Sequence, residues 1–147
     1  MGIEENNKEL IRHQVELYNK HDIDAANEIY GRDSFTPYMT WEQNKEGDIM
    51  YLNALPDVKF TILDMIAEGD KVAYILNTQG THTGGHWMGI PATGKRVDRT
   101  STYIVNIADN KIVKMRGTPD GTMPQQLGIM PSWGEAIQAY KETHNLE

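Results

Sequence analysis

The sequence of 147 residues lacks cysteine, an excess of basic charge and any long apolar run. Without cysteine the chain has no disulfide, no thiol nucleophile and no thiolate metal site. The formal net charge of -7 and the lack of a basic run argue against nucleic acid or an anionic membrane as a partner. No apolar run approaches the roughly 20 residues that a membrane-spanning helix needs. The segment Met1–Asn6 has no signal-peptide pattern, so a cytoplasmic location is expected.

Several catalytic motifs are also missing. No Gly-Lys-Ser/Thr sequence opens a helix after a strand, which excludes a phosphate-binding loop. No Gly-x-Ser-x-Gly sequence is present, so a serine nucleophile is not indicated. His82 and His86 are four residues apart, but Thr83 and two glycines between them disfavour a helix, and no third ligand accompanies them. No metal site is therefore expected.

The length predicts one domain over residues 1–147, large enough for a core and one ligand pocket. Residues 1–5 are expected to be disordered. Residues 129–147 are expected to form a helical extension, because Ser132 and Glu135 make a capping box before an apolar stripe. That helix is expected to pack on the body of the protein or on another subunit.

The first part of the chain has the period of helices. Asn6 and Glu9 are suited to cap a first helix, and apolar residues recur behind them at helical spacing up to Tyr18. Two further helices are expected over residues 22–30 and 42–53.

From residue 57 onward the apolar period changes to two. Strands are expected over residues 58–67, 72–82, 97–108 and 111–117, with tight turns at Gly69 and at Asp109-Asn110. Strands joined by hairpins pair antiparallel. Helices followed by a run of strands predict an α+β fold in which the helices cover one face of the sheet.

Asp120 is the candidate catalytic residue. It follows the last strand, and a desolvated carboxylate can remove a proton next to a carbonyl group. Arg116, four residues earlier, could lower the pKa of this carboxyl or stabilise a developing enolate. The alternative is that Pro119-Asp120-Gly121 is a turn and that Asp120 caps the short helix that follows. The residues alone leave both interpretations open.

The candidate ligand contacts come from the strands and from the aromatic residues. His82 ends the second strand and is expected either to face a pocket or to bond loop carbonyls. In the third strand, Arg99 and Tyr103 share one face, but the alternation does not decide whether that face is the inner one. The remaining candidates could line an apolar cavity or form ordinary core; they are Tyr18, Trp41, Trp87 and Met115.

The order of the turn and strand segments resembles the SnoaL-like polyketide cyclase (ester cyclase) family of the nuclear-transport-factor-2-like superfamily. The matching segments span about residues 8–128; they are Pro56–Phe60, Gly69–Val72, Gly80–Gly84, Gly89–Lys95, Lys111–Val113, Asp120 and Gln126–Gly128. The resemblance implies a cone in which three helices and a strongly curved antiparallel sheet enclose a pocket. It also implies homo-oligomers, often dimers that form through the outer face of the sheet.

The resemblance implies a cofactor-independent enzyme that closes a ring in a polyketide-like or ester carbonyl substrate by intramolecular aldol condensation. Asp120 would be its general acid/base, and the substrate would be a small hydrophobic carbonyl compound. Met115 and Arg116 stand where the family often has His and Trp, which leaves the substrate open. The alternatives are a protein that binds a small hydrophobic ligand without catalysis, and a related isomerase, dehydratase or epoxide hydrolase. A dimeric interaction domain with a filled core is a third hypothesis.

Overall fold

Within residues 2–147, which the computed structural model describes, four strands form one antiparallel sheet in chain order. Their bounds are β1 Lys59–Glu68, β2 Lys71–Thr81, β3 Arg96–Ala108 and β4 Lys111–Pro119. The turns lie where the sequence predicts them. Gly69, Asp109 and Asn110 have φ angles of 57°, 49° and 58°, the left-handed conformation that tight hairpin turns require.

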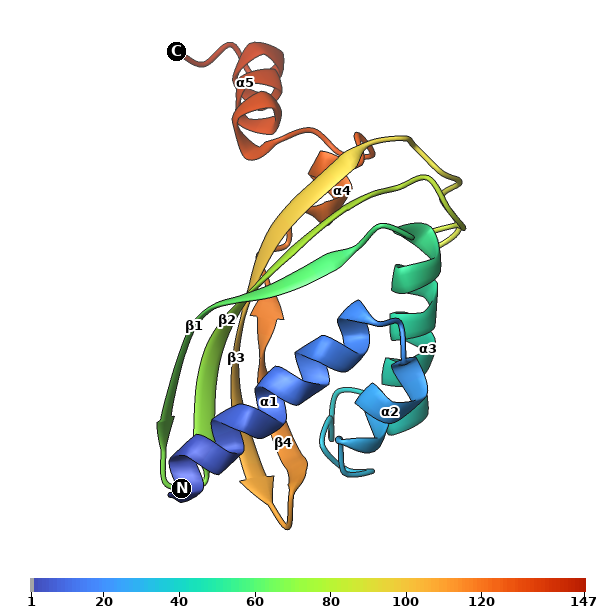
Figure 1. Cartoon of the computed structure of the whole chain (residues 1–147). Helices are drawn as coiled ribbons and strands as arrows, with labels where there is room; N and C mark the ends of the chain where they lie inside the picture. The colour runs from blue at the N-terminus through green and yellow to red at the C-terminus, as the bar shows by residue number, and fades with distance from the viewer. Residues whose placement is uncertain (1) are drawn as a thin grey trace.

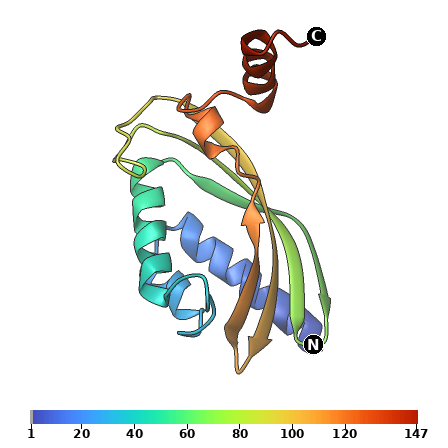
Figure 2. The same cartoon turned by 180° about the vertical axis from the view of Figure 1, so that it is seen from behind.

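The sheet is strongly curved, and the three N-terminal helices lie on its concave side (Figures 1 and 2). The pairing register shifts between Ile62 and Asp64 in β1 and between Asn106 and Ile107 in β3. Such irregularities add local twist and bend to a strand. The α+β fold that the sequence predicts and the cone that the family resemblance implies are therefore both observed.

The helices are α1 Ile3–Asn19, α2 Ile23–Glu28 and α3 Trp41–Ala54. Helix α3 begins with a complete capping box in which the Thr40 and Gln43 side chains each bond the other residue's backbone N–H. Helix α1 packs mainly against β1, and α2 lies against both α1 and α3. The helices thus close the open side of the curved sheet.

Helix α1 starts earlier than the sequence predicts. Its N-cap is Gly2 and not Asn6, and residues 3–5, expected to be disordered, form its first turn. Acidic side chains in the first turn favour this start because the N-terminal end of a helix carries partial positive charge. The Glu5 carboxylate also accepts a hydrogen bond of 2.9 Å from Arg12 two turns along.

The buried apolar residues form two clusters. The first joins α1 and the segment after α2 to the middle of the sheet and is centred on Ile11, Val72 and Ile112. The second lies under the end of α3 and includes Leu52, Leu55 and Val97. The space between these clusters is the interior of the cone.

The chain ends with two helices, α4 Met123–Gln126 and α5 Trp133–Thr143. Helix α4 is the short helix that the turn interpretation of Asp120 expects; it lies against β3 and contributes the buried Met123. Helix α5 has the predicted capping box of Ser132 and Glu135, but it contributes no buried residue to the described chain. Figures 1 and 2 both show it standing away from the sheet and the other helices. Across the described residues, none of the helices is long and apolar enough to cross a membrane.

Candidate active site

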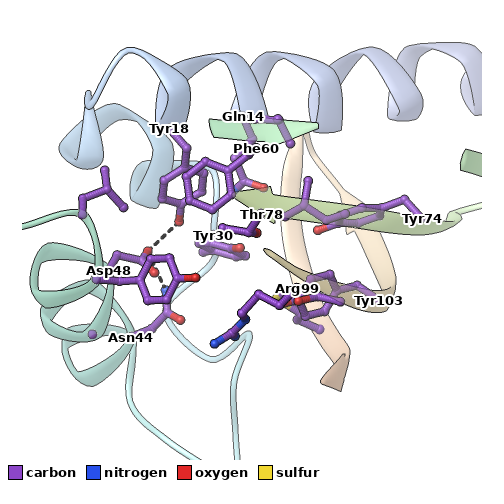
Figure 3. Close-up of a pocket in the computed structure, with 17 residues that line it drawn as sticks. Gln14, Tyr18, Tyr30, Asn44, Asp48, Phe60, Tyr74, Thr78, Arg99 and Tyr103 are labelled. Carbon is purple, nitrogen blue, oxygen red and sulfur yellow. Dashed lines mark hydrogen bonds between the residues drawn. The ribbon is translucent and has the colours of Figure 1, made fainter. Parts of the chain in front are cut away.

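A cavity of about 200 Å³ lies between the sheet and helices α1 and α3 (Figure 3). Tyrosines make up much of its wall; they are Tyr18, Tyr30, Tyr51, Tyr74 and Tyr103. Among the described residues that line it, the charged ones are Asp48 and Arg99. A concave site with apolar walls and a few polar groups is the usual form of a small-molecule pocket.

A second cavity of about 250 Å³ adjoins the first. The two share Asn44, Tyr103 and Met115 as lining residues, and the second extends toward Tyr38 and Pro119. Small-molecule sites usually have volumes of roughly 300–1,000 Å³. The two cavities together therefore offer room for a compact organic ligand.

The structure identifies which face of β3 points inward. Arg99, Ser101 and Tyr103 line the cavity, whereas Ile104 is exposed on the opposite face. The candidate ligand contacts Tyr18 and Met115 line the same cavity. Four predicted contact residues from α1, β3 and β4 are thus brought together; they are Tyr18, Arg99, Tyr103 and Met115.

Asp48 is the carboxylate of this cavity, and the sequence analysis did not identify it. Its Oδ2 accepts hydrogen bonds from the Tyr18 hydroxyl at 2.6 Å and from the Asn27 amide at 3.0 Å. The Asn44 amide donates to the same oxygen at 3.4 Å. Within residues 2–147 no hydrogen bond engages Oδ1 of Asp48. One oxygen is therefore held in place, with its hydrogen bond from Tyr18 drawn as a dashed line in Figure 3, and the other has no hydrogen-bond partner among the described residues.

Burial raises the pKa of the Asp48 carboxyl, and hydrogen bonds from Tyr18 and Asn27 offset this effect only in part. Burial also raises the pKa of the Tyr18 hydroxyl well above its usual value, so this group keeps its proton and acts as a donor. A carboxylate whose pKa is raised by an apolar surrounding is a stronger base than a solvated one. The cavity thus contains a group suited to accept a proton from carbon.

Asp120 lies in a different environment from the one expected. Its side chain is exposed and does not line either cavity. The carboxylate accepts hydrogen bonds from the backbone N–H groups of Thr100 at 2.9 Å and Thr122 at 3.0 Å, and from the Thr122 hydroxyl at 2.7 Å. Partial desolvation opposes these bonds, but the bonds and the nearby Arg99 charge hold the pKa of Asp120 below its usual value. The turn interpretation describes this local structure, and a catalytic role for Asp120 stays a prediction.

His82 does not face the pocket as the first of its two interpretations expects. The side chain is fully buried, and its ring nitrogens contact the Thr93 hydroxyl at 3.1 Å and the Gly85 carbonyl oxygen at 3.0 Å. Both polar atoms of the ring thus have partners in the connection between β2 and β3. The structure therefore places His82 as a support of this connection and away from the cavity lining.

Three other candidate contacts also lie outside the cavity lining. Trp41 is buried in the first core cluster and donates its indole N–H to the Asn27 carbonyl oxygen at 2.9 Å. Trp87 packs against the second cluster. Arg116 is exposed and donates to the Asn106 side chain at 3.3 Å, because it follows the inward-facing Met115 and so points to the opposite face of β4.

Asp48, Asn27 and Tyr51 are the site residues that sequence reasoning missed. A signal for Asp48 does exist in the sequence. Trp41, Asn44 and Asp48 follow one another at spacings of three and four, the spacing of a single helix face. An acid on the same face as a buried tryptophan is unlike the usual solvated carboxylate of a helix. No comparable pattern marks Asn27, whose side chain was one of many polar groups in a short helix.

The sequence matches the SnoaL-like polyketide cyclase family over residues 8–127. AclR, a proposed hydroxylase from Streptomyces galilaeus, is similar in fold with a TM-score of 0.78 and 21% identity, over 97% of this chain and 98% of AclR. TsrD from Streptomyces laurentii has a TM-score of 0.73 and 23% identity, over 84% of this chain and 95% of TsrD.

IdmH, a proposed polyketide cyclase from Streptomyces antibioticus, has a TM-score of 0.69 and 24% identity, over 83% of this chain and 98% of IdmH. A search of curated proteins finds no match. The structural similarities at these identities show a shared fold, and the family match extends over most of the chain. The chain belongs to the SnoaL-like polyketide cyclase family.

Proposed function

We propose that the protein is a cyclase-type enzyme that binds a small carbonyl compound in the cavity and uses Asp48 as its general acid/base. The reaction proposed is the intramolecular aldol cyclisation expected from the family resemblance, an addition that loses no water. The observation that carries the proposal is the carboxylate of Asp48 on the cavity wall, with a raised pKa and with Oδ1 free of hydrogen bonds within residues 2–147.

In this reaction Oδ1 of Asp48 accepts a proton from the carbon next to a substrate carbonyl group. The electron pair of the broken C–H bond forms an enolate, and the enolate carbon attacks a second carbonyl of the same molecule. A C–C bond forms and the attacked oxygen becomes an alkoxide. Asp48 returns its proton to that alkoxide, so the product is an isomer of the substrate and no oxidant or reductant is consumed.

The three donors around Oδ2 give Asp48 a fixed orientation. Tyr18 reaches it from α1, Asn27 from α2 and Asn44 from α3, so the carboxylate is held where the three helices meet. A catalytic group held by its neighbours loses little entropy when the substrate binds. These residues act as positioning residues, and the tyrosine-rich wall is suited to a flat, unsaturated carbonyl compound.

We expect Asp48→Asn to lower kcat by at least about 100-fold, the usual contribution of a general base. The substrates to be tested are aromatic polyketides and β-keto esters. Turnover is measured by chromatography of the cyclised product. Glu46→Gln is a matched control because Glu46 is an exposed carboxylate on the same helix. Both variants preserve side-chain size and remove one negative charge, so only the position of the charge differs.

The pH profile gives an independent readout of the same group. Because Asp48 must be ionised to accept a proton, kcat/KM should rise with pH through the raised pKa of Asp48 and then level off. Asp120→Asn is the competing variant. A loss of turnover in Asp120→Asn with full activity in Asp48→Asn would contradict the proposal and would favour Asp120 as the base. Ligand binding without turnover in the unsubstituted protein would instead support the non-catalytic alternative.

A further inference from the structure

Two buried donor atoms beside the cavity have no hydrogen-bond partner within residues 2–147. They are Nε of Arg99 and the hydroxyl of Tyr51. Both residues line the cavity, Arg99 from β3 and Tyr51 from α3. The Arg99 guanidinium carbon lies 5.3 Å from the centre of the Tyr51 ring, so the two groups lie together. Buried polar atoms nearly always have a hydrogen-bond partner. Two buried donors without partners beside one cavity therefore point to a ligand that accepts their hydrogen bonds.

The Arg99 and Tyr51 side chains both act as hydrogen-bond donors toward a ligand at neutral pH. An arginine side chain is always charged and carries only donors. Burial raises the pKa of Tyr51 to about 12, against the opposing effect of the Arg99 charge, so the phenol stays protonated. A ligand atom that satisfies both must therefore be an acceptor, and an oxygen with negative charge would bind most strongly.

Asp48 and Arg99 belong to the same cavity but do not form an ion pair within the described chain. Figure 3 shows the Arg99 side chain extending from the sheet toward the helix that carries Asn44 and Asp48. Tyr51 lies three residues after Asp48, on the same face of α3. The base and the donor pair therefore border one space, and a substrate between them can contact both.

We propose that Arg99 and Tyr51 form an oxyanion site that binds the enolate oxygen of a neutral β-dicarbonyl substrate while Asp48 holds the proton taken from its carbon. This inference rests on the proposed function and adds the substrate class and the groups that stabilise the enolate. Donors fixed in advance toward an oxygen that gains charge stabilise the transition state strongly in a water-poor site.

The charges of the cavity favour a substrate that arrives neutral. When Asp48 takes a proton from such a substrate, one negative charge moves from the carboxylate to the enolate, opposite Arg99. A substrate with its own carboxylate would add a second negative charge to a cavity whose described lining offers one cation. The exposed Asp120 is close enough for Arg99 to lower the pKa of its carboxyl, and as an anion it offers no charge that would compensate a second anion.

The test uses benzoylacetone, a β-diketone whose enolate has its own ultraviolet absorption. Titration with the unsubstituted protein should give the enolate spectrum at a pH where the free diketone is still neutral. Arg99→Gln should weaken binding of the enolate at least tenfold, and Tyr51→Phe should weaken it severalfold. Arg96→Gln is the matched control, because Arg96 is exposed on the same strand and bonds Gln79.

Asp48→Asn separates this inference from the proposed function. It should lower turnover by at least the roughly 100-fold expected above and still bind the enolate that forms in solution at higher pH, because Arg99 and Tyr51 are intact. Equal enolate affinity in Arg99→Gln, Tyr51→Phe and the unsubstituted protein would overturn the inference. Tighter binding of 3-phenylpropanoate than of the diketone enolate would also overturn it, since the site would then recognise a carboxylate. Tyr51→Phe keeps the test decisive even where Arg99→Gln fails to fold, as shown by circular dichroism.

Discussion

Asp48 and Asp120 have the same carboxyl group but opposite pKa shifts. Burial dominates at Asp48 and raises its pKa, whereas backbone and hydroxyl donors outweigh the partial desolvation of Asp120 and lower its pKa. The difference follows from position. Asp48 lies on the inward face of a helix, and Asp120 follows a strand end where free N–H groups of the chain are close. A raised pKa suits proton transfer, and a lowered one suits a structural charge.

The lowered pKa of Asp120 predicts how the unfolding free energy of the protein depends on pH. A carboxyl whose folded-state pKa lies below its unfolded value of about 3.9 stabilises the fold above that value, and this stabilisation is lost as the pH falls through the folded-state pKa. Asp120→Asn should therefore cost about 1 kcal/mol of unfolding free energy at pH 7, given the exposure of the group. The cost should shrink as the pH falls below about 4, as urea unfolding at several pH values would measure.

The control for this experiment is Asp33→Asn, since the Asp33 carboxylate accepts no hydrogen bond within residues 2–147. It should change stability far less at any pH. A cost of Asp120→Asn that is the same at pH 3 and pH 7 would show that the ionised carboxylate is not the stabilising group.

For single residues, the sequence predicted candidate reactive side chains but did not predict which of them the fold would bury. Asp120 and His82 were predicted as site residues because each lies at the end of a strand. At those positions their side chains form hydrogen bonds with backbone or loop groups. Asp48 was overlooked because an acid in a helix is usually solvated. Whether a helix face carrying Asn44 and Asp48 points into a cavity depends on the packing of α3 against the sheet, which local spacing does not contain.

The elements themselves were predicted well because each is marked by local chemistry. Glycine and Asn-type turns separate the strands, and a capping box marks the start of α5. Which face of β3 points inward could not be predicted, because each face carries both polar and apolar residues. It is fixed by the partner strands, as Tyr103 pairs with Tyr74 in β2 and with Gly117 in β4.

Gly117 is the position in β4 where the sheet requires glycine. Its φ is +126°, and a Cβ atom there would lie 2.0 Å from the Thr102 carbonyl oxygen and 2.8 Å from the Tyr103 Cα. Gly117→Ala should therefore lower the unfolding free energy by more than about 3 kcal/mol, because backbone atoms on both strands must move. It should also weaken ligand binding, since Tyr103 and Gly117 line the second cavity.

Gly69→Ala is the matched control, because Gly69 also has a positive φ of 57° but no atom within 4 Å of an added Cβ. It should cost about 1 kcal/mol, the usual cost of a left-handed conformation for alanine. Chemical denaturation of both variants gives the comparison. Equal costs would indicate that backbone conformation alone, and not the close approach of β3, requires glycine at position 117.

The whole molecule consists of a packed cone and a C-terminal extension that shares little of its core. Among the described residues the cone extends to Leu127, which is buried in the second cluster. Beyond it, Trp133, Ile137 and Tyr140 form the predicted apolar stripe of α5, and all three are exposed, Trp133 by 80%. Of the two partners expected for this stripe, the body of the same chain is therefore not the one that covers it.

We propose that the stripe on α5 contacts a second copy of the chain, in line with the homo-oligomer that the family resemblance implies. Removal of residues 131–147 should leave the thermal midpoint within about 2 °C of the full chain, because the extension adds no buried residue to the cone. The same deletion should convert a dimer to a monomer in sedimentation analysis. The physical reason is that burial of the stripe removes apolar surface from water at about 25 cal/mol per Å².

Trp133→Ser with Ile137→Ser separates the stripe from the rest of the extension. Both substitutions should weaken self-association as the deletion does, whereas Gln138→Ser, on an exposed residue of the same helix that is not part of the stripe, should leave it unchanged. A full chain that sediments as a monomer, or a truncated chain that remains a dimer, would contradict the assignment of the contact to α5. A large fall in the thermal midpoint on truncation would show that α5 packs on its own cone in solution.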